Sequence, residues 1–118
     1  MNDTEARKFL EDAFATLFDP KSTEEQVQKF FSPKYVQDLN GKLFTFREFF
    51  DGVSGMKKQF SSFKVKFTSV GSSGTTIAEV HVVQAFKSDG SSIKFKVIAL
   101  QTVDKGRIVG VEEVNCPL

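Results

Sequence analysis

The sequence predicts an α+β domain in which helices fill most of the first half and an antiparallel sheet fills the second. Two observations predict this order: apolar residues recur at three- and four-residue spacing before residue 60, and three Gly-containing turns divide the chain after it. The segment YVQDLNGKLFTFREFF, which reads as strand, turn, strand and helix start, joins the two parts. We expect residues 1–118 to form one domain, because chains of this length usually fold as a single unit.

The composition is that of a globular protein and limits the possible partners. Hydrophobic residues make up 40% of the chain and charged residues 26%. With 16 Lys and Arg against 15 Asp and Glu, the net charge of +1 argues against nucleic acid, whose binding needs a clearly basic face. No apolar run approaches the roughly 20 residues of a membrane span. We therefore expect neither nucleic acid nor a membrane as a partner.

The counts of three residue types narrow the expectations further. The single Cys116 cannot form an internal disulfide, and one His and one Cys far apart do not make a metal site. We expect no metal and no cofactor, and the lack of a signal peptide indicates the cytoplasm. Fourteen Phe exceed what a core of this size needs. This excess predicts either a large aromatic core or a cavity lined with rings.

Two helices are expected before the joining segment. The first covers residues 3–18 and ends at Asp19-Pro20. Its apolar face consists of Ala6, Phe9, Leu10, Ala13, Phe14, Leu17 and Phe18. The second is short, begins at the capping-box pair Ser22 and Glu25 and stops at Ser32-Pro33. It presents Val27, Phe30 and Phe31.

The joining segment contains two short strands and the start of a third helix. Residues 35–38 and 42–44 read as strands on either side of the Asn40-Gly41 turn. Thr45 and Glu48 form a capping box, from which the third helix runs to about Gln59. Its apolar side carries Phe46, Phe49, Phe50, Val53 and Phe60.

The three later turns share one pattern and fix a strand register. Residues 71–74, 87–90 and 103–106 each end in Gly, which fits three-residue hairpin loops closed by a left-handed Gly. The predicted pairs are Val70 with Thr76, Phe86 with Ser92, and Thr102 with Ile108. Alternation along the strands then places one set of side chains on the face that the helices cover. This set is Phe63, Val65, Phe67, Glu79, His81, Val83, Phe95, Val97, Ala99, Gln101, Val109, Val111 and Glu113.

The opposite face of the sheet is predicted to mix charge with an apolar patch. Lys64, Lys66, Lys94 and Lys96 fall there at strand alternation. The patch consists of Val80, Val82, Phe86, Ile98 and Leu100. An apolar patch on a solvated face usually marks an interface, so we expect a homodimer through this face.

The order of elements, the YVQDLNGK segment, the Asp-Gly turn and the terminal DKGRIVGVEEV strand resemble the nuclear transport factor 2-like superfamily, and more closely its SnoaL-like branch. The resemblance spans nearly the whole chain. It implies a cone-shaped fold in which a strongly curved sheet wraps around three helices and leaves a deep pocket. Ketosteroid isomerases, polyketide cyclases and dehydratases share this fold, so the fold alone does not give a function.

The isomerase branch offers a test at the level of residues. Its general base is an Asp in a turn after the first short strand, and Asp38 stands in that place. Its two oxyanion donors, a Tyr and a protonated Asp, correspond here to Phe14 and Ala99, which donate nothing. The resemblance therefore does not imply a steroid-isomerase mechanism.

Three polar residues are candidates for chemistry in the pocket, each with a simpler alternative. Asp38 is either a general base or the cap of its own turn. His81 is either a proton shuttle or a neutral side chain satisfied by a carboxylate such as Glu79. Glu113 faces the pocket if the register holds, whereas a shift of one residue would turn Glu112 inward instead.

These observations favour a domain that binds a small apolar ligand in a Phe-lined pocket. The expected ligand-binding residues are Phe14, Tyr35, Phe49, Glu79, Val97, Gln101, Val111 and Glu113. The first alternative is an isomerase, cyclase or dehydratase without a cofactor, in which Asp38 or His81 is the catalytic acid or base. The second alternative is a protein–protein interaction module.

Overall fold

The computed structural model describes all residues, 1–118, and contains three helices and six strands. Their bounds are α1 (Asp3–Phe18), α2 (Glu24–Gln28), β1 (Phe31–Leu39), β2 (Lys42–Thr45), α3 (Phe46–Gln59), β3 (Ser62–Ser73), β4 (Thr76–Phe86), β5 (Ser92–Asp104) and β6 (Arg107–Pro117). The element order is the one that the sequence predicts. The strands form one sheet in the order β2-β1-β6-β5-β4-β3.

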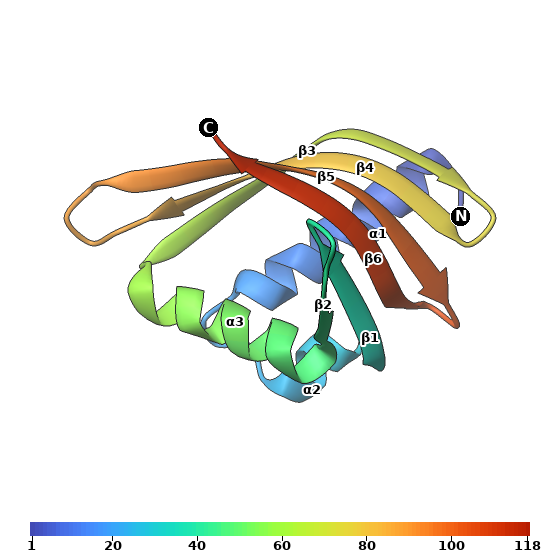
Figure 1. Ribbon diagram of the computed structural model, residues 1–118, viewed down its shortest axis with the longest axis horizontal. Coiled ribbons are helices and arrows are strands. Elements are labelled where there is room, and N and C mark those ends of the chain that lie inside the picture. Colours follow the sequence, from blue (N-terminus) through green and yellow to red (C-terminus); the bar gives the residue numbers. More distant parts are fainter.

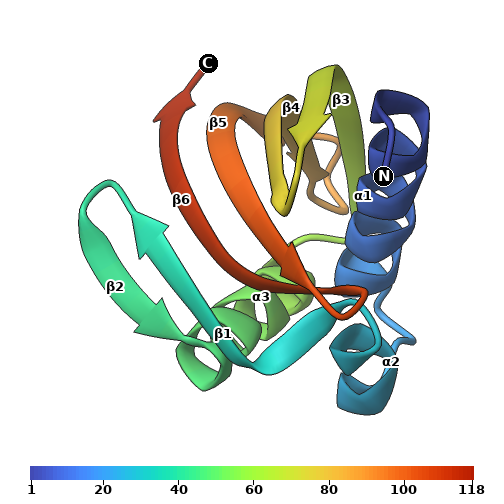
Figure 2. The same ribbon diagram turned by 90° about the vertical axis from the view of Figure 1, so that its right-hand side faces the viewer.

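The sheet is mixed, because β1 runs parallel to β6 while all other neighbours are antiparallel. The helices lie on one face of it (Figure 1). In the perpendicular view, α1 runs beside β3, and α3 lies near β1 (Figure 2). The sheet bends over the helices without closing into the strongly curved cone that the resemblance implies.

The helix starts follow from side-chain capping. The Thr45–Glu48 capping box is confirmed, with Thr45 N donating to Glu48 Oε1 at 3.0 Å and Glu48 N to Thr45 Oγ1 at 3.2 Å. The second capping box lies one residue later than the sequence predicts: Thr23 and Gln26, not Ser22 and Glu25, cap α2. A hydroxyl and a carboxamide satisfy the free amides there as well as the predicted pair would have done.

Phe31 belongs to β1 and not to the second helix. It pairs in parallel with Ile108, and both side chains are fully buried. The amide of Ile108 also donates to the carbonyl of Phe30 at 2.7 Å. Burial against the distant strand β6 therefore outweighs the local helical pattern, and β1 begins four residues earlier than the Tyr35 start that the sequence suggests.

Of the three hairpins, only β4–β5 has the predicted loop, in which Phe86 pairs with Ser92. The other two have two-residue loops: Ser73 pairs with Thr76, and Asp104 with Arg107. In the latter, Lys105 and Gly106 both have positive φ, 52° and 78°, as a type I′ turn requires.

Both short hairpins also contain a register shift, between Phe67 and Ser69 and between Thr102 and Val103. The shorter loop places Val70 opposite Glu79 instead of Thr76. The shorter loop and the register shift together place Thr102 opposite Gly110 instead of Ile108.

The predicted faces survive these changes except next to the two short turns. Beyond each bulge the pairing is displaced by an even number of residues, so side chains keep their side of the sheet. Glu79, His81 and Gln101 are accordingly buried, as predicted. Next to these turns the alternation is reversed. Val70, opposite Glu79, packs against the core, and Ile108 is fully buried whereas Val109 is not.

Two polar contacts fix α1 and α3 in place. Arg7 Nη1 donates to the carbonyl of Phe67 at 2.5 Å, beside the bulge of β3. Lys57 Nζ donates to the carbonyls of Leu17 and Asp19 at 2.9 and 3.1 Å, at the end of α1. Arg7 therefore ties α1 to β3, and Lys57 ties α3 to the end of α1.

Candidate functional site

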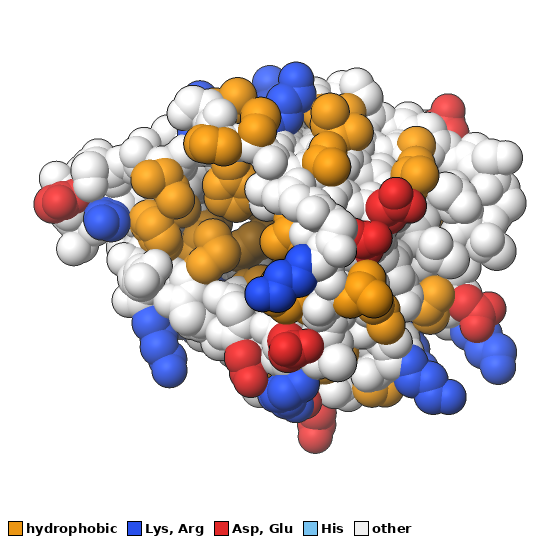
Figure 3. Space-filling view, in the orientation of Figure 1, with side chains coloured by type: hydrophobic (Ala, Val, Ile, Leu, Met, Phe, Trp, Pro, Cys, Tyr) orange, Lys and Arg blue, Asp and Glu red, His pale blue; other side chains and the backbone are white.

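A cavity of about 290 Å³ lies between the helices and the inner face of the sheet. Its aromatic lining consists of Phe14, Phe18, Tyr35, Phe44, Phe49 and Phe95, and its polar lining of Gln37, Glu48, His81, Gln101, Glu113 and Asn115. The molecular surface is hollowed between the sheet and α3, and hydrophobic side chains surround the hollow (Figure 3). This inner cavity is the candidate site.

The structure brings seven of the ten predicted site residues into the lining: Phe14, Tyr35, Phe49, His81, Val97, Gln101 and Glu113. Val111 is part of the buried core instead. Glu79 lies behind His81 and does not line the cavity. Asp38 is not in the lining either.

Glu79 and His81 form a buried pair on β4. His81 Nδ1 lies 2.8 Å from Glu79 Oε1 and 3.0 Å from Oε2, and both residues are 3% exposed. An ionised carboxylate only accepts hydrogen bonds, so Nδ1 carries a proton and Nε2 is the nitrogen left for a ligand. The ring of His81 also packs against the rings of Phe14 and Phe67, with centroids 5.0 Å apart in both cases.

Gln101 completes this cluster from β5. Its Nε2 donates to Glu79 Oε2 at 3.1 Å. The residue is 2% exposed, and Oε1 is the one buried side-chain nitrogen or oxygen atom in the structure without a hydrogen-bond partner. An unpaired buried acceptor costs about 1–3 kcal/mol, so this oxygen marks a place where a donor is missing.

Glu113 enters the cavity from β6, whereas Glu112 faces outward and is exposed. The sequence left open which of the two faces the pocket. Gln37 Nε2 donates to Glu113 Oε1. Burial raises the pKa of Glu113; the bond from Gln37 and the nearby His81 lower it, and Glu79 raises it further. The carboxylate therefore has a neutral partner and no paired Lys or Arg.

Tyr35 lines the same cavity from β1. It is 3% exposed, and its ring packs on Phe31 and Phe49 at centroid distances of 5.3 and 4.7 Å. Burial raises its pKa well above 10, and the charges of Glu113 and Glu79 add to the rise. The phenol is therefore neutral and able to donate a hydrogen bond.

Asp38 caps its own turn. Its Oδ1 accepts from the amide of Gly41 at 3.0 Å, which is the simpler of the two sequence interpretations. In the parallel register Asp38 lies beside the outward-facing Glu112. The neighbouring Gln37 takes the inward position on β1, and alternation from Tyr35 would have identified it in the sequence.

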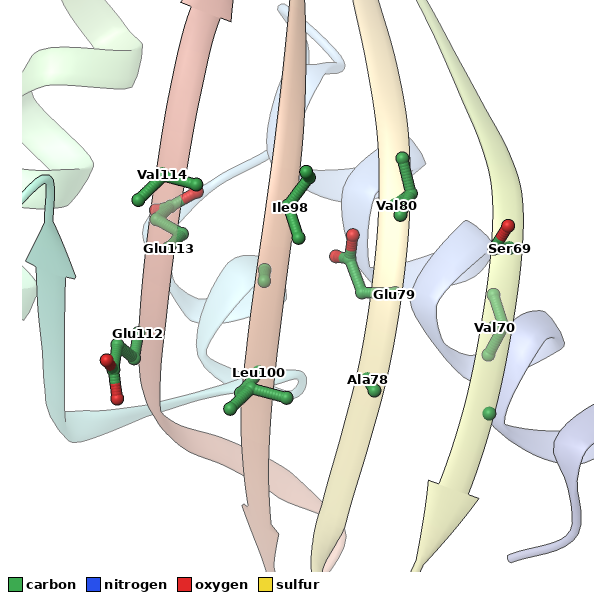
Figure 4. A pocket seen from close by; sticks show the side chains of 12 residues that line it. Ser69, Val70, Ala78, Glu79, Val80, Ile98, Leu100, Glu112, Glu113 and Val114 are labelled. Carbon is green, nitrogen blue, oxygen red and sulfur yellow. The ribbon is translucent and has the colours of Figure 1, made fainter.

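A second hollow, of about 560 Å³, lies on the outer face of the sheet. Val80, Ile98 and Val114 form one row across β4, β5 and β6, and Ala78 and Leu100 lie in the next (Figure 4). Glu79 and Glu113 border it through their backbones, because their side chains alternate to the inner face. The buried polar cluster therefore belongs to the inner cavity.

No three His, Cys, Asp or Glu side chains are grouped so that they could hold a metal ion. No helix is long and apolar enough to cross a membrane.

No protein-family model matches the chain. An uncharacterized protein of Schizosaccharomyces pombe is 24% identical over 111 residues, which is 94% of this chain and 85% of that protein.

Two solved structures resemble the chain along almost its whole length. A nuclear transport factor 2-like protein of unknown function from Exiguobacterium superposes with a TM-score of 0.70 at 18% identity, covering 93% of this chain and 98% of that one. A candidate polyketide cyclase from Acidithiobacillus ferrooxidans superposes with a TM-score of 0.71 at 17% identity, covering 93% of this chain and 87% of that one. The chain therefore has the nuclear transport factor 2-like fold.

Proposed function

We propose that this protein binds a small, mainly apolar molecule in the inner cavity and orients it by hydrogen bonds at the Glu79–His81–Gln101 cluster. The observation that carries the proposal is the unpartnered Oε1 of Gln101, a buried acceptor in a residue of the lining. A ligand that donates a hydrogen bond there would recover the cost of the unpaired acceptor.

The size and lining of the cavity support the same function. Its volume of about 290 Å³ is just below the range for ligand sites, roughly 300–1,000 Å³, so the ligand is expected to be small. Rings form much of the wall, and two of its polar residues, His81 and Gln101, are both bonded to Glu79, so an apolar wall with a few fixed polar groups is present, as is usual for small-molecule sites. A protein–protein module would gain nothing from this cavity, which favours the ligand-binding function over that alternative.

The test uses two glycines of α3. Gly52 lines the cavity and Gly55 does not, and a Cβ added at either would meet no atom within 4 Å. Gly52→Leu should fill part of the cavity, while Gly55→Leu adds the same side chain to the same helix outside it. We expect the neutral fluorophore N-phenyl-1-naphthylamine to bind the natural protein and Gly55→Leu equally.

The Gly52→Leu variant should lose at least about tenfold in affinity for this fluorophore, since a filled cavity leaves no room for its rings. Circular dichroism of both variants checks that α3 is intact. Equal binding by both variants, or no binding by the natural protein, would overturn the proposal.

A second candidate function is proton transfer at a carbon next to a carbonyl, with His81 as the acid or base. The Glu79–His81 pair favours it, because a carboxylate on Nδ1 fixes the tautomer and orients the ring. Incubation of 2-tetralone with the protein in deuterated buffer should then exchange the protons next to its carbonyl.

His81→Gln should abolish this exchange and still bind N-phenyl-1-naphthylamine. Asp38→Asn, outside the cavity, should leave the exchange unchanged. No exchange above the buffer rate with the natural protein would reject the enzymatic candidate and leave the binding function standing.

A further inference from the structure

The inner cavity is acidic as well as aromatic. Glu48 and Glu113 belong to its lining, and no Lys or Arg does. Glu79 adds a third carboxylate directly behind His81. The group of Glu79, His81 and Glu113 contains two carboxyl groups and one imidazole. The lining therefore holds carboxyl groups that no Lys or Arg of the lining pairs with.

Glu113 is the carboxylate for which a cation is missing. It is half-buried, and its Oε1 accepts from the neutral amide of Gln37. His81 Nδ1 is already bonded to Glu79, so the imidazole does not serve as a partner for Glu113 alone. A half-buried carboxylate without a cationic partner is costly to keep ionised. A cationic ligand would remove that cost.

The neighbouring polar atoms accept hydrogen bonds. Gln101 Oε1 is buried and unpartnered. Gln101 is opposite Val111 in the register and is therefore a diagonal neighbour of Glu113 on the adjacent strand. The Cα atoms of such neighbours are roughly 7–8 Å apart. An acid anion or a carbonyl compound would place further acceptors against these oxygens, whereas a group with several N–H donors suits both.

The rings around these acceptors also suit a cation. Phe and Tyr faces attract ammonium groups electrostatically, and the attraction grows as water is excluded. A cation already lies over one ring at the rim: Lys42 Nζ is 5.2 Å from the centroid of Phe44. Lys42 itself is exposed and outside the lining, so it leaves the inner charge unbalanced.

We propose that the ligand of the inner cavity is a protonated amine with an apolar body, whose ammonium group pairs with Glu113 and donates to Gln101 Oε1 while its body lies among the Phe rings. This inference rests on the proposed binding function and specifies its ligand class. It excludes carboxylic acids of the same shape, because their charge would face Glu113.

The test compares three probes that each carry a phenyl ring on a four-carbon chain: 4-phenylbutylamine, 4-phenylbutan-1-ol and 4-phenylbutyrate, whose fourth carbon from the ring is the carboxyl carbon. Titration calorimetry at neutral pH should show the amine binding at least about tenfold more tightly than the alcohol, since a charge-assisted hydrogen bond is about twice as strong as a neutral one. The carboxylate should bind more weakly than the alcohol.

The matched variants are Glu113→Gln and Glu112→Gln, which remove the same charge from adjacent positions on opposite faces of β6. Glu113→Gln should reduce amine affinity at least about tenfold and leave alcohol affinity within about twofold. Glu112→Gln should change neither. Retained alcohol binding by Glu113→Gln also shows that this variant is folded.

Two results would overturn the inference while leaving the proposed function intact: alcohol or carboxylate binding as tight as the amine, or equal amine affinity in both variants. Binding of no probe by the natural protein would overturn the inference, and failure of N-phenyl-1-naphthylamine to bind would overturn the proposed function as well. The fluorophore therefore separates the two failures.

Discussion

Glu79 and His81 lie two residues apart on β4, and the 2.8 Å contact between Glu79 Oε1 and His81 Nδ1 joins them on the inner face of the sheet. Residues i and i+2 of a strand point to the same side, so the strand itself brings the carboxylate to the imidazole. Gln101 approaches the same carboxylate from β5. One side chain, Glu79, therefore satisfies two buried donors.

Removal of the Glu79 carboxylate should destabilise the protein strongly. In Glu79→Ala both His81 Nδ1 and Gln101 Nε2 lose their acceptor inside the core, and breaking a buried pair in this way costs about 3–5 kcal/mol. Urea unfolding measures the change in the free energy of unfolding. Glu11→Ala, at an exposed position of α1 away from the sheet, is the control and should cost less than about 0.5 kcal/mol. Equal costs for both variants would show that the pair is not structural.

Glu113 should make stability depend on pH. Burial raises its pKa in the folded state, so the folded protein holds this proton more tightly than the unfolded chain does. Its stabilising contribution is present below the ordinary pKa of about 4.5 and is lost as the pH rises through the higher folded pKa. Glu113→Gln cannot titrate. It should gain stability relative to the natural protein as the pH rises from 4 to 8.

The measurement is urea unfolding of both proteins at several pH values. The groups that face Glu113 are Gln37 on β1 and Glu79 and His81 on β4, and they remain in the variant. A difference in the free energy of unfolding between the two proteins that does not vary with pH would contradict the prediction.

Asp38 should contribute to stability and not to ligand binding. Asp38→Ala removes the acceptor of the Gly41 amide and should lower the free energy of unfolding by about 1 kcal/mol. Asp38→Asn keeps an acceptor oxygen and should cost less. Both variants should bind N-phenyl-1-naphthylamine like the natural protein. A variant of unchanged stability that has lost binding or proton exchange would show instead that Asp38 acts in the site.

The outer face of the sheet is expected to form a homodimer. Ile98, Leu100 and Val114 are 53%, 49% and 54% exposed, and burial of such side chains is worth about 1.5–3 kcal/mol each. The charges along this face are separated: Lys66 and Lys96 flank the apolar rows at one end of the strands, and Glu112 lies at the other. A two-fold axis that lies in the interface plane and runs perpendicular to the strands would bring the two faces together. It would place the basic end of one copy on the acidic end of its partner.

Sedimentation at micromolar concentration should therefore show a dimer, and Ile98→Glu with Leu100→Glu should convert it to a monomer. The charge pattern gives a sharper test. Lys96→Glu alone should weaken the dimer, and Lys96→Glu combined with Glu112→Lys should restore it, because the exchanged charges meet again across the axis. A monomer in the natural protein, or no restoration in the double variant, would contradict this arrangement.

The sequence alone determined the element order, the Thr45–Glu48 cap and most of the side-chain faces. These features depend on interactions within a few residues or on strict alternation, which survives a displacement of two residues in the β3–β4 and β5–β6 pairings. That is why His81, Gln101 and Glu113 are found on the inner face as predicted, although Val70 and Thr102 have other partners than expected.

The tertiary structure decided what depends on distant parts of the chain. β1 and β6 are far apart in the sequence and pair in parallel. This pairing makes Phe31 part of a strand and brings Gln37 into hydrogen-bond contact with Glu113. The same pairing set Asp38 beside the outward Glu112 and left Val111 in the core. No local pattern encodes such a contact, since it arises from the packing of the whole sheet on its helices, and the acceptor left open at Gln101 is visible only once that packing is complete.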